Sequence, residues 1–512
     1  MDSTIKKNNG AEQASLAHRA ADATFATDPI PASPTIRLAA AGGTLPSIEK
    51  IRDDFLKPIT PGNFGKWSRY WVIGLAVVMA WGLFAYIYQL RTGLEATAMR
   101  NYVSWGLYIA TFVFIIGISH SGTLVSAILR VTNQEWRRPI TRSAELLTAV
   151  ALMFGGLMPI IDMGRPDRVL NMVFFGRLQS PLVWDIVCIT TYLTGSLMFL
   201  YLPMIPDIAL AKKRFANTAS KSRLWIYDKL AMGWEGTPEQ WRRLERAMRV
   251  MTVMIIPIAV SVHTVISYIF AMTLRAGWDS TIFGPYFVVG ALYSGSAGVI
   301  LVMAAFRKIY HLEEYITPRH FDLMSKIVLA LTMIYAYFNF NEYWVSAYKM
   351  ESGEAPLLRN LFSGGYSTVF WILQFGTVLL PIIILATPRG RKPVLATITC
   401  VVIVAGAWVK RYIIIIPVLL HPFLPMQHAP LSWTNYFPNW VEFSVVGGML
   451  AGILLVITLF SKFFPISSIW EVEEGVHVAQ RAAAGLPPTV ASHNGKDHKH
   501  TLAPAIEEAF AQ

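Results

Sequence analysis

The chain has 512 residues, of which 54% are hydrophobic and 15% are charged, and it carries a formal net charge of +12. Soluble domains carry roughly 25% charged residues, so this composition excludes an ordinary soluble protein and indicates one that spans a membrane. The basic residues lie in short loops between apolar runs, which is typical of cytoplasmic loops and not of a nucleic-acid-binding surface. We therefore expect the lipid bilayer as a partner, and no nucleic acid.

Residues 1–66 are predicted to form an N-terminal extension. Its first part is rich in Ala, Thr, Ser and Pro and has no apolar period, so we expect it to be partly extended. The segment 47–57 predicts a short interfacial helix with Ile48, Ile51 and Phe55 on one face.

Residues 67–464 contain ten apolar runs of the length that crosses a bilayer. The predicted spans are 70–90, 103–130, 143–163, 181–205, 250–274, 283–306, 325–348, 367–387, 394–417 and 441–464. An even number of spans puts both termini on one side of the membrane. The loops on that side carry more than twice as many Lys and Arg residues as the opposite loops, so both termini, including the C-terminal tail 465–512, are expected to be cytoplasmic.

The second and third spans each carry an ionisable residue. His120 interrupts one apolar run and Asp162 closes the next, and a short basic loop joins the two spans. Ionisable groups within a membrane usually face a protein-lined cavity and mark a proton or ligand site. A partly buried carboxylate is a good base for a hydroxyl being oxidised, so Asp162 and His120 are the candidate catalytic residues. The alternative is a structural hydrogen bond between helices.

A helix-breaking loop, residues 164–168, follows Asp162. Arg165 is able to hold Asp162 charged or to position a ligand oxygen, whereas Asp167 is able to pair with Arg165 or Arg168 as an ordinary loop ion pair. The sequence leaves both readings open, and we include Arg165 and Asp167 in the candidate ligand site.

The fourth span begins on the same side of the membrane. Trp184 is typical of an interfacial anchor, and the neighbouring carboxylate of Asp185 offers a proton exit. We include both in the candidate ligand site.

Three later spans also carry polar side chains. They are His263 in the fifth span, Asn339, Asn341 and Glu342 in the seventh, and Lys410 and Arg411 in the ninth. Adjacent cations in an apolar run need acids or a water-filled path. We assign His263 and Glu342 to the ligand site, and the two asparagines and the two cations to a proton path.

Four segments together resemble the ActC-type branch of the NrfD/polysulfide-reductase membrane-subunit family. They read GISHSGTLVSAILR, EWRRPITRSAE, PIIDMGRPDR and YFNFNEYW, and the resemblance covers roughly residues 67–464. It implies an all-α polytopic membrane protein in which two four-helix bundles, spans two to five and six to nine, are flanked by spans one and ten. It also implies the inner membrane of a bacterium.

The functional implication of the resemblance is a quinol:electron-acceptor oxidoreductase complex of the alternative complex III type. Quinol, either menaquinol or ubiquinol, would be oxidised near the outer face, with His120 and Asp162 lining the pocket and Arg165 nearby. The implied partners are an iron–sulfur ferredoxin-like subunit, a multihaem cytochrome c subunit and a second NrfD-like membrane subunit. Two separated cysteines, Cys188 and Cys400, cannot bind an iron–sulfur cluster, so the chain is expected to hold no metal and to be inactive alone.

Three alternatives remain open. A polysulfide-reductase-type subunit would reduce quinone in the same kind of pocket. A membrane cytochrome b would use His120 and His263 as axial haem ligands on separate spans. A proton-coupled secondary transporter would use the same charges for ion coupling, although the clearest helix break lies at the outer end and not near the midplane.

Overall fold

The computed structural model describes residues 46–62, 65–273, 275–424, 428 and 430–483, and all regular secondary structure within them is helical. The helices are α3 (Ile48–Leu56), α4 (Lys66–Thr92), α5 (Leu107–Val131), α6 (Thr141–Gly155), α7 (Met158–Asp162), α8 (Val169–Phe174), α9 (Pro181–Tyr201), α10 (Ile205–Arg214), α11 (Lys221–Leu230), α12 (Pro238–Ala271), α13 (Phe283–Ile309), α14 (Pro318–Lys349), α15 (Ala355–Phe362), α16 (Ser367–Leu373), α17 (Leu380–Ala386), α18 (Pro393–Leu420), α19 (Trp440–Phe463) and α20 (Ile469–Ala483). Short 3₁₀ turns are η1 (Lys57–Ile59), η2 (Leu94–Ala96), η3 (Glu135–Arg137), η4 (Pro166–Arg168), η5 (Leu202–Met204) and η7 (Leu431–Thr434), and η6 (Gln374–Leu379) is a π-helical segment.

The described part of the chain contains ten helical segments long and apolar enough to cross a membrane. Each segment coincides with one predicted span. Three segments consist of two consecutive helices each: α6 with α7, α9 with α10, and α16 with α17. The prediction of an all-α polytopic membrane protein with ten transmembrane helices is therefore confirmed.

Several helices begin earlier than their apolar runs. Helix α12 has 34 residues, a length of about 51 Å, whereas the hydrocarbon core is about 30 Å thick. Its first turn is closed by a reciprocal capping box between Thr237 and Gln240. The charged residues after this capping box are helical and lie outside the apolar span. Charged side chains do not interrupt a helix where it projects into water.

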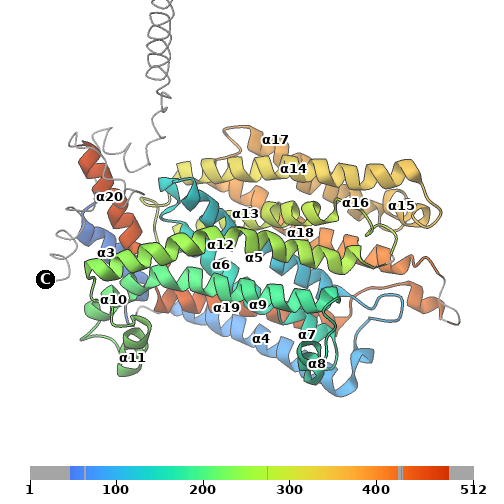
Figure 1. Cartoon of the computed structure of the whole chain (residues 1–512), viewed down its shortest axis with the longest axis horizontal. Coiled ribbons are helices and arrows are strands. Elements are labelled where there is room, and N and C mark those ends of the chain that lie inside the picture. Colours follow the sequence, from blue (N-terminus) through green and yellow to red (C-terminus); the bar gives the residue numbers. More distant parts are fainter. Residues whose placement is uncertain (1–45, 63–64, 274, 425–427, 429, 484–512) are drawn as a thin grey trace, which may run out of the picture. The chain divides into compact units, whose positions relative to one another are not determined.

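The spans pack as the two predicted bundles. Helices α5, α6, α9 and α12 contact one another in a closed ring, and α13, α14, α16–α17 and α18 form a second ring. Helix α13 packs against both α5 and α12 and so joins the rings, and α19 pairs with α4 and also contacts α6 (Figure 1). Helix α5 is almost entirely buried, whereas α4 exposes most of its length.

The pairing of α4 with α19 depends on two glycines. A Cβ atom placed on Gly82 would lie 2.7 Å from the Cα of Gly448, and the reverse substitution would be equally close. The two backbones approach so closely because neither residue has a side chain, which is a common way for helices to pack in membranes.

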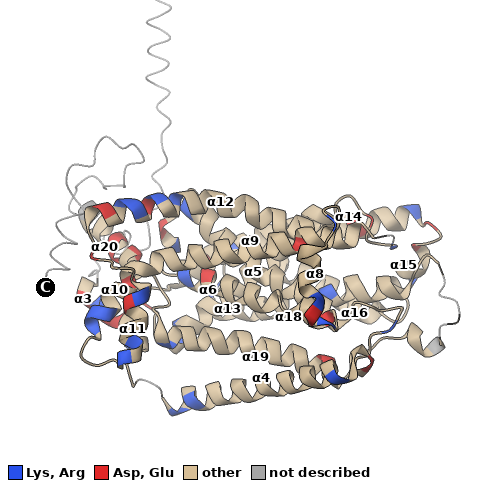
Figure 2. Cartoon of the chain, turned by 60° about the horizontal axis from the view of Figure 1, so that its bottom comes forward, with Lys and Arg blue, Asp and Glu red and all other residues tan. Residues whose placement is uncertain are grey.

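Lys, Arg, Asp and Glu residues gather towards the ends of the spans, and few of them lie in the middle of the bundles (Figure 2). We call the end formed by α10, α11 and the α5–α6 loop the clamp end, and the opposite end, formed by α7, α8 and α15, the Asp162 end (Figure 1).

At the clamp end, the α5–α6 region supplies four arginines that we call the arginine clamp: Arg130, Arg137, Arg138 and Arg142. Arg142 is 1% exposed and pairs with the buried Asp207 of α10 at 2.6 Å. It also donates to the carbonyls of Ser467 at 2.9 Å and Pro203 at 2.7 Å. Asp207 in turn accepts the backbone N–H of Ile469 at 3.0 Å, so it caps the start of α20.

The other three arginines surround a second buried acid, Glu471, in the first turn of α20. Its carboxylate pairs with Arg130 at 2.6 Å and with Arg137 at 2.8 Å, and Arg138 donates to its carbonyl at 2.7 Å. Burial opposes the ionisation of Glu471, but the three guanidinium groups outweigh it and hold the pKa of this carboxyl well below its ordinary value. The basic loop thus anchors the segment that follows α19.

The predicted amphipathic helix near the N-terminus is present as α3. Ile51 and Phe55 are buried, and the Phe55 ring lies 4.7 Å from that of Tyr315. The Tyr315 hydroxyl donates to Asp54 at 2.9 Å. The apolar face of α3 therefore packs on the protein, on the loop before α14.

By its internal contacts the chain divides into one unit of residues 47–474 and 492–512 and another of residues 1–46 and 475–491. The features above belong to the first unit. The predicted extended segment before Pro46 and the tail after residue 483 lie outside the described residues.

Candidate functional site

Two histidines meet inside the first bundle. His120 of α5 and His263 of α12 are both fully buried, and their ring centroids are 4.0 Å apart at an interplanar angle of 54°. None of their four ring nitrogens forms a hydrogen bond of ordinary geometry among the described residues, although the backbone of Ala259 in α12 is close enough to act on His120. The Tyr192 ring of α9 lies 5.2 Å from that of His120. The sequence predicted both histidines as site residues, but not that they touch.

This geometry argues against the cytochrome b alternative. A metal–nitrogen bond to imidazole is about 2.0–2.1 Å long, so two axial imidazoles on one iron hold their ring centroids roughly 6 Å apart with a porphyrin between them. The observed separation of 4.0 Å leaves no room for that arrangement.

Asp162 is the last residue of α7 at the Asp162 end. Its Oδ1 atom is buried and has no hydrogen-bond partner among the described residues. Gln89 of α4 donates to the carbonyl of Ile161 at 3.1 Å and accepts from the Tyr108 hydroxyl at 2.6 Å. These two bonds fix the backbone beside Asp162, so Gln89 and Tyr108 position it. No hydrogen bond joins Asp162 to His120 in the described part of the chain.

A second acid lies close to Asp162. Glu442, at the start of α19, is fully buried and accepts the backbone N–H of Ala98 at 2.9 Å as well as the Tyr436 hydroxyl. It lies close enough to Asp162 to act on it electrostatically. The sequence did not predict Gln89, Tyr108 or Glu442 as site residues. Gln89 and Glu442 each lie near the end of an apolar run, and a polar residue at such a position could have indicated them.

In the loop after Asp162, Arg165 pairs with Asp167. Arg165 forms hydrogen bonds to Asp167 at 3.1 and 3.0 Å, and both side chains are about 60% exposed. The guanidinium lowers the pKa of Asp167, as expected of an exposed ion pair. Of the two readings that the sequence left open, the structure shows the ion pair of Arg165 with Asp167, and a role of Arg165 towards a ligand stays a prediction.

The two predicted residues of the fourth span differ in burial. Trp184 is half exposed and donates from Nε1 to the Leu178 carbonyl at 2.6 Å, which makes it an anchor for the loop before α9. Asp185 is buried, and its Oδ1 atom has no partner among the described residues. Asp185 thus resembles Asp162, which is partly exposed, in having a buried Oδ1 atom without a hydrogen-bond partner among the described residues.

The remaining predicted residues lie in the second bundle. The Asn339 amide accepts from Tyr286 at 3.0 Å and donates to Gln374 of the π-helical segment at 2.6 Å. Asn341 instead donates back to Tyr337 of its own helix at 2.8 Å. It therefore does not join the buried network that its neighbour forms.

The two adjacent cations of α18 are both buried. Lys410 donates to the Tyr343 hydroxyl at 2.8 Å, and the guanidinium of Arg411 lies 4.7 Å from the centroid of the Phe287 ring. Arg411 is also close enough to His263 to act on it electrostatically. Glu342 is a charged neighbour of Lys410. The structure thus puts Glu342 among the residues of the predicted proton path and in a different bundle from Asp162.

Comparison with known proteins identifies the family. The sequence profile described as "Polysulphide reductase, NrfD" matches residues 95–422, a stretch that covers both bundles. The chain belongs to this family. Helices α4 and α19 lie outside the matched stretch, so the NrfD part corresponds to the two rings of helices, to which the α4–α19 pair is added.

Several relatives are membrane subunits of redox enzymes. The chain is 29% identical over 64% of its length to a putative dimethyl sulfoxide reductase membrane subunit of Halobacterium salinarum, covering 72% of that protein. It is 25% identical over 77% of its length to the menaquinone reductase integral membrane subunit of Nitratidesulfovibrio vulgaris, covering 91% of it. It is 24% identical over 79% of its length to the Hdr-like menaquinol oxidoreductase integral membrane subunit of Archaeoglobus fulgidus, covering 95% of it. The transporter alternative gains no support from these names.

Proposed function

We propose that this chain is the quinol-binding membrane subunit of a quinol:electron-acceptor oxidoreductase of the alternative complex III type. The observation that carries the proposal is the carboxylate of Asp162, whose Oδ1 atom is buried without a hydrogen-bond partner among the described residues and whose backbone is fixed through Gln89. Two relatives whose names refer to menaquinone or menaquinol support the choice of a quinol as substrate. The narrower ActC-type resemblance supports the assignment of the complex.

In this proposal Asp162 acts as the base. Oxidation of a quinol to a quinone releases two protons and two electrons. The carboxylate of Asp162 accepts one hydroxyl proton. The imidazoles of His120 and His263, in the same bundle, hold the second proton. General-base catalysis of this kind is worth about 100- to 10,000-fold in rate.

The electrons leave to a partner. The two free cysteines, Cys188 and Cys400, are on different spans and do not provide the ligands of a cluster. An iron–sulfur subunit docked at the Asp162 end, followed by a multihaem cytochrome c, would accept the electrons. The excess of Lys and Arg in the loops at the clamp end supports a cytoplasmic location for that end, and hence proton release on the opposite side of a bacterial inner membrane.

The reverse reaction is the second candidate. The Nitratidesulfovibrio relative is named as a menaquinone reductase, and a pocket that deprotonates quinol also protonates quinone. The potentials of the partner subunits decide the direction.

The test is quinol-dependent reduction of c-type haem in the complex that co-purifies with this chain. We expect Asp162→Asn to assemble normally and to lose at least about 100-fold in turnover, because the amide keeps the volume but is no base. The matched control is Asp228→Asn, an exposed carboxylate paired with Lys212 at the clamp end. Full turnover in the Asp162 variant, or purification of the chain without redox partners, would contradict the proposal.

A further inference from the structure

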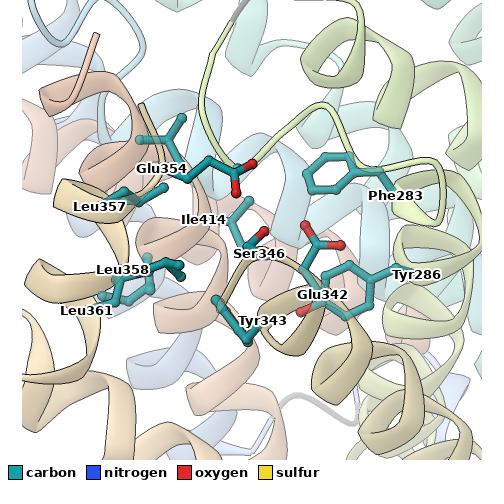
Figure 3. A pocket seen from close by; sticks show the side chains of 13 residues that line it. Phe283, Tyr286, Glu342, Tyr343, Ser346, Glu354, Leu357, Leu358, Leu361 and Ile414 are labelled. Carbon is teal, nitrogen blue, oxygen red and sulfur yellow. The ribbon is translucent and has the colours of Figure 1, made fainter. Parts of the chain in front are cut away.

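A small cavity lies in the second bundle at the Asp162 end, between α13, α14, α15 and α18. It has a volume of about 30 Å³, enough for one or two water molecules. Two acids, Glu342 and Glu354, and the hydroxyl of Ser346 line it (Figure 3). The rest of its wall is mainly apolar and aromatic, and includes Phe283 and Leu357.

Each acid at this cavity has one carboxylate oxygen without a partner, while its interactions include Ser280 for Glu342 and Ser346 for Glu354. Glu342 is 9% exposed and Glu354 is 7% exposed, and the Oε2 atom of each has no hydrogen-bond partner among the described residues. Buried polar groups are nearly always satisfied, by protein or by an ordered water. A water needs two to four polar partners, and the two carboxylates with the Ser346 hydroxyl supply them. The cavity therefore fits water and an exchangeable proton.

The charges around the cavity do not balance if both acids are ionised. The buried cation beside it is Lys410, whose ammonium is held by the Tyr343 hydroxyl and lies 4.6 Å from the centroid of that ring. The adjacent buried cation, Arg411, lies over the Phe287 ring and acts on Tyr286 and Tyr335, whereas Lys410 acts on Glu342. Lys410 compensates one carboxylate, and two carboxylates that share a site of low polarity do not both ionise. One of the two acids is then left to carry a proton.

We propose that Glu342 and Glu354 share one exchangeable proton through water in this cavity, with Lys410 as the counter-ion of the ionised partner. This is a proton-exchange site of the second bundle, separate from Asp162. It reassigns Glu342 from the quinol pocket. The proposal stands independently of the quinol assignment, because it concerns only protonation of this chain.

The other charged and titratable neighbours also favour one proton bound to the pair of acids. Asp279, in the loop before α13, acts on both acids and disfavours two negative charges. Glu351 repels Glu354 further, while Lys349 attracts it. Burial is the main cause that raises the pKa of Glu354. The two tyrosine hydroxyls near Glu342, those of Tyr286 and Tyr343, bring no positive charge.

Infrared spectroscopy of the purified full-length chain in detergent tests the site. The probe is the carbonyl stretching band of a protonated carboxylic acid and its shift when H₂O is replaced by D₂O. We expect one such band in the wild type to disappear in both Glu342→Gln and Glu354→Gln. The matched control, Glu313→Gln, removes an exposed acid of the clamp end and leaves the band in place.

A fourth variant guards against loss of folding. Ser346→Leu fills the cavity and keeps both acids, so we expect the band to remain and its exchange in D₂O to slow severalfold. A band that survives both Gln variants overturns the proposal. A band that is abolished by sodium chloride but not by choline chloride also overturns it, because the cavity is then a cation site. Asp162→Asn leaves this band unchanged, so failure here is distinguishable from failure of the quinol proposal.

Discussion

The arginine clamp is buried or partly buried and the His120–His263 pair is fully buried, but only the clamp pairs its polar groups with partners of opposite charge. Each arginine of the clamp has a carboxylate partner within 2.8 Å, and Asp207 caps the start of α20 besides. The two imidazoles have no hydrogen-bond partner among the described residues.

This difference indicates a structural role for the arginine clamp and a chemical role for the histidine pair. Buried charges that are paired and hydrogen-bonded hold two segments in one arrangement, and removing one partner is costly. Buried polar groups without partners add nothing to folding and persist where a ligand or proton must be received. The two clusters therefore make opposite predictions about stability and turnover.

The largest stability effect is expected at Arg142. Replacement by Leu leaves Asp207 charged and buried beside the start of α20, and it should lower the free energy of unfolding by about 3–5 kcal/mol. Adding Asp207→Asn removes the stranded charge but keeps an oxygen for the helix cap, so the double variant should recover part of the loss. Thermal unfolding of the detergent-solubilised chain measures both. A double variant less stable than Arg142→Leu would show that the charge itself is not the cause.

A smaller effect, dependent on pH, is expected at Glu471. Its folded-state pKa is depressed, so its contribution is complete above the ordinary carboxyl pKa of about 4.3 and is lost as the pH falls below it. Glu471→Gln should therefore lower stability by about 3 kcal/mol at pH 7, and the difference from the wild type should shrink below about pH 4.3. Unfolding midpoints across that range check this, with Glu313→Gln as the surface control. A difference that stays constant with pH would contradict the ion-pair explanation.

The histidine pair should behave in the opposite way. We expect His120→Leu and His263→Leu to leave stability unchanged or to raise it by up to about 2 kcal/mol, because each removes an unsatisfied buried polar group. Quinol turnover of the complex should fall in both variants. The same unfolding and haem-reduction assays apply. A clear loss of stability would mean that ordered water satisfies the pair, and the contrast with the clamp would then fail.

The fold was largely predictable because apolar length alone defines a span. All ten segments were found, whereas the start of α12 at Pro238 was missed, since a helix continues into water as long as its caps and propensity allow. The division into two bundles came from the family resemblance and not from periodicity.

The candidate site residues follow from the sequence and stay predictions, whereas their contacts could not be predicted. His120, His263 and Asp162 were marked by their cost in a membrane, yet the 4.0 Å approach of the imidazoles depends on how α5 packs on α12. The basic loop was read as a topology signal, and its arginines also anchor the chain after α19. Gln89 acts through a backbone carbonyl of another helix, a contact that no local pattern encodes.

The smallest effect is expected at Arg165, which distinguishes an exposed ion pair from a ligand contact. Its pair with Asp167 is exposed on both sides, and such pairs contribute about 0–1 kcal/mol. Arg165→Gln should therefore leave the unfolding midpoint nearly unchanged, and any effect of the pair on stability should vanish at high salt. The second measurement is the turnover of the complex as a function of quinol concentration. If Arg165 orients the head group, KM for quinol rises while the midpoint stays fixed; if neither quantity changes, Arg165 belongs with the paired charges of the clamp end and not with Asp162.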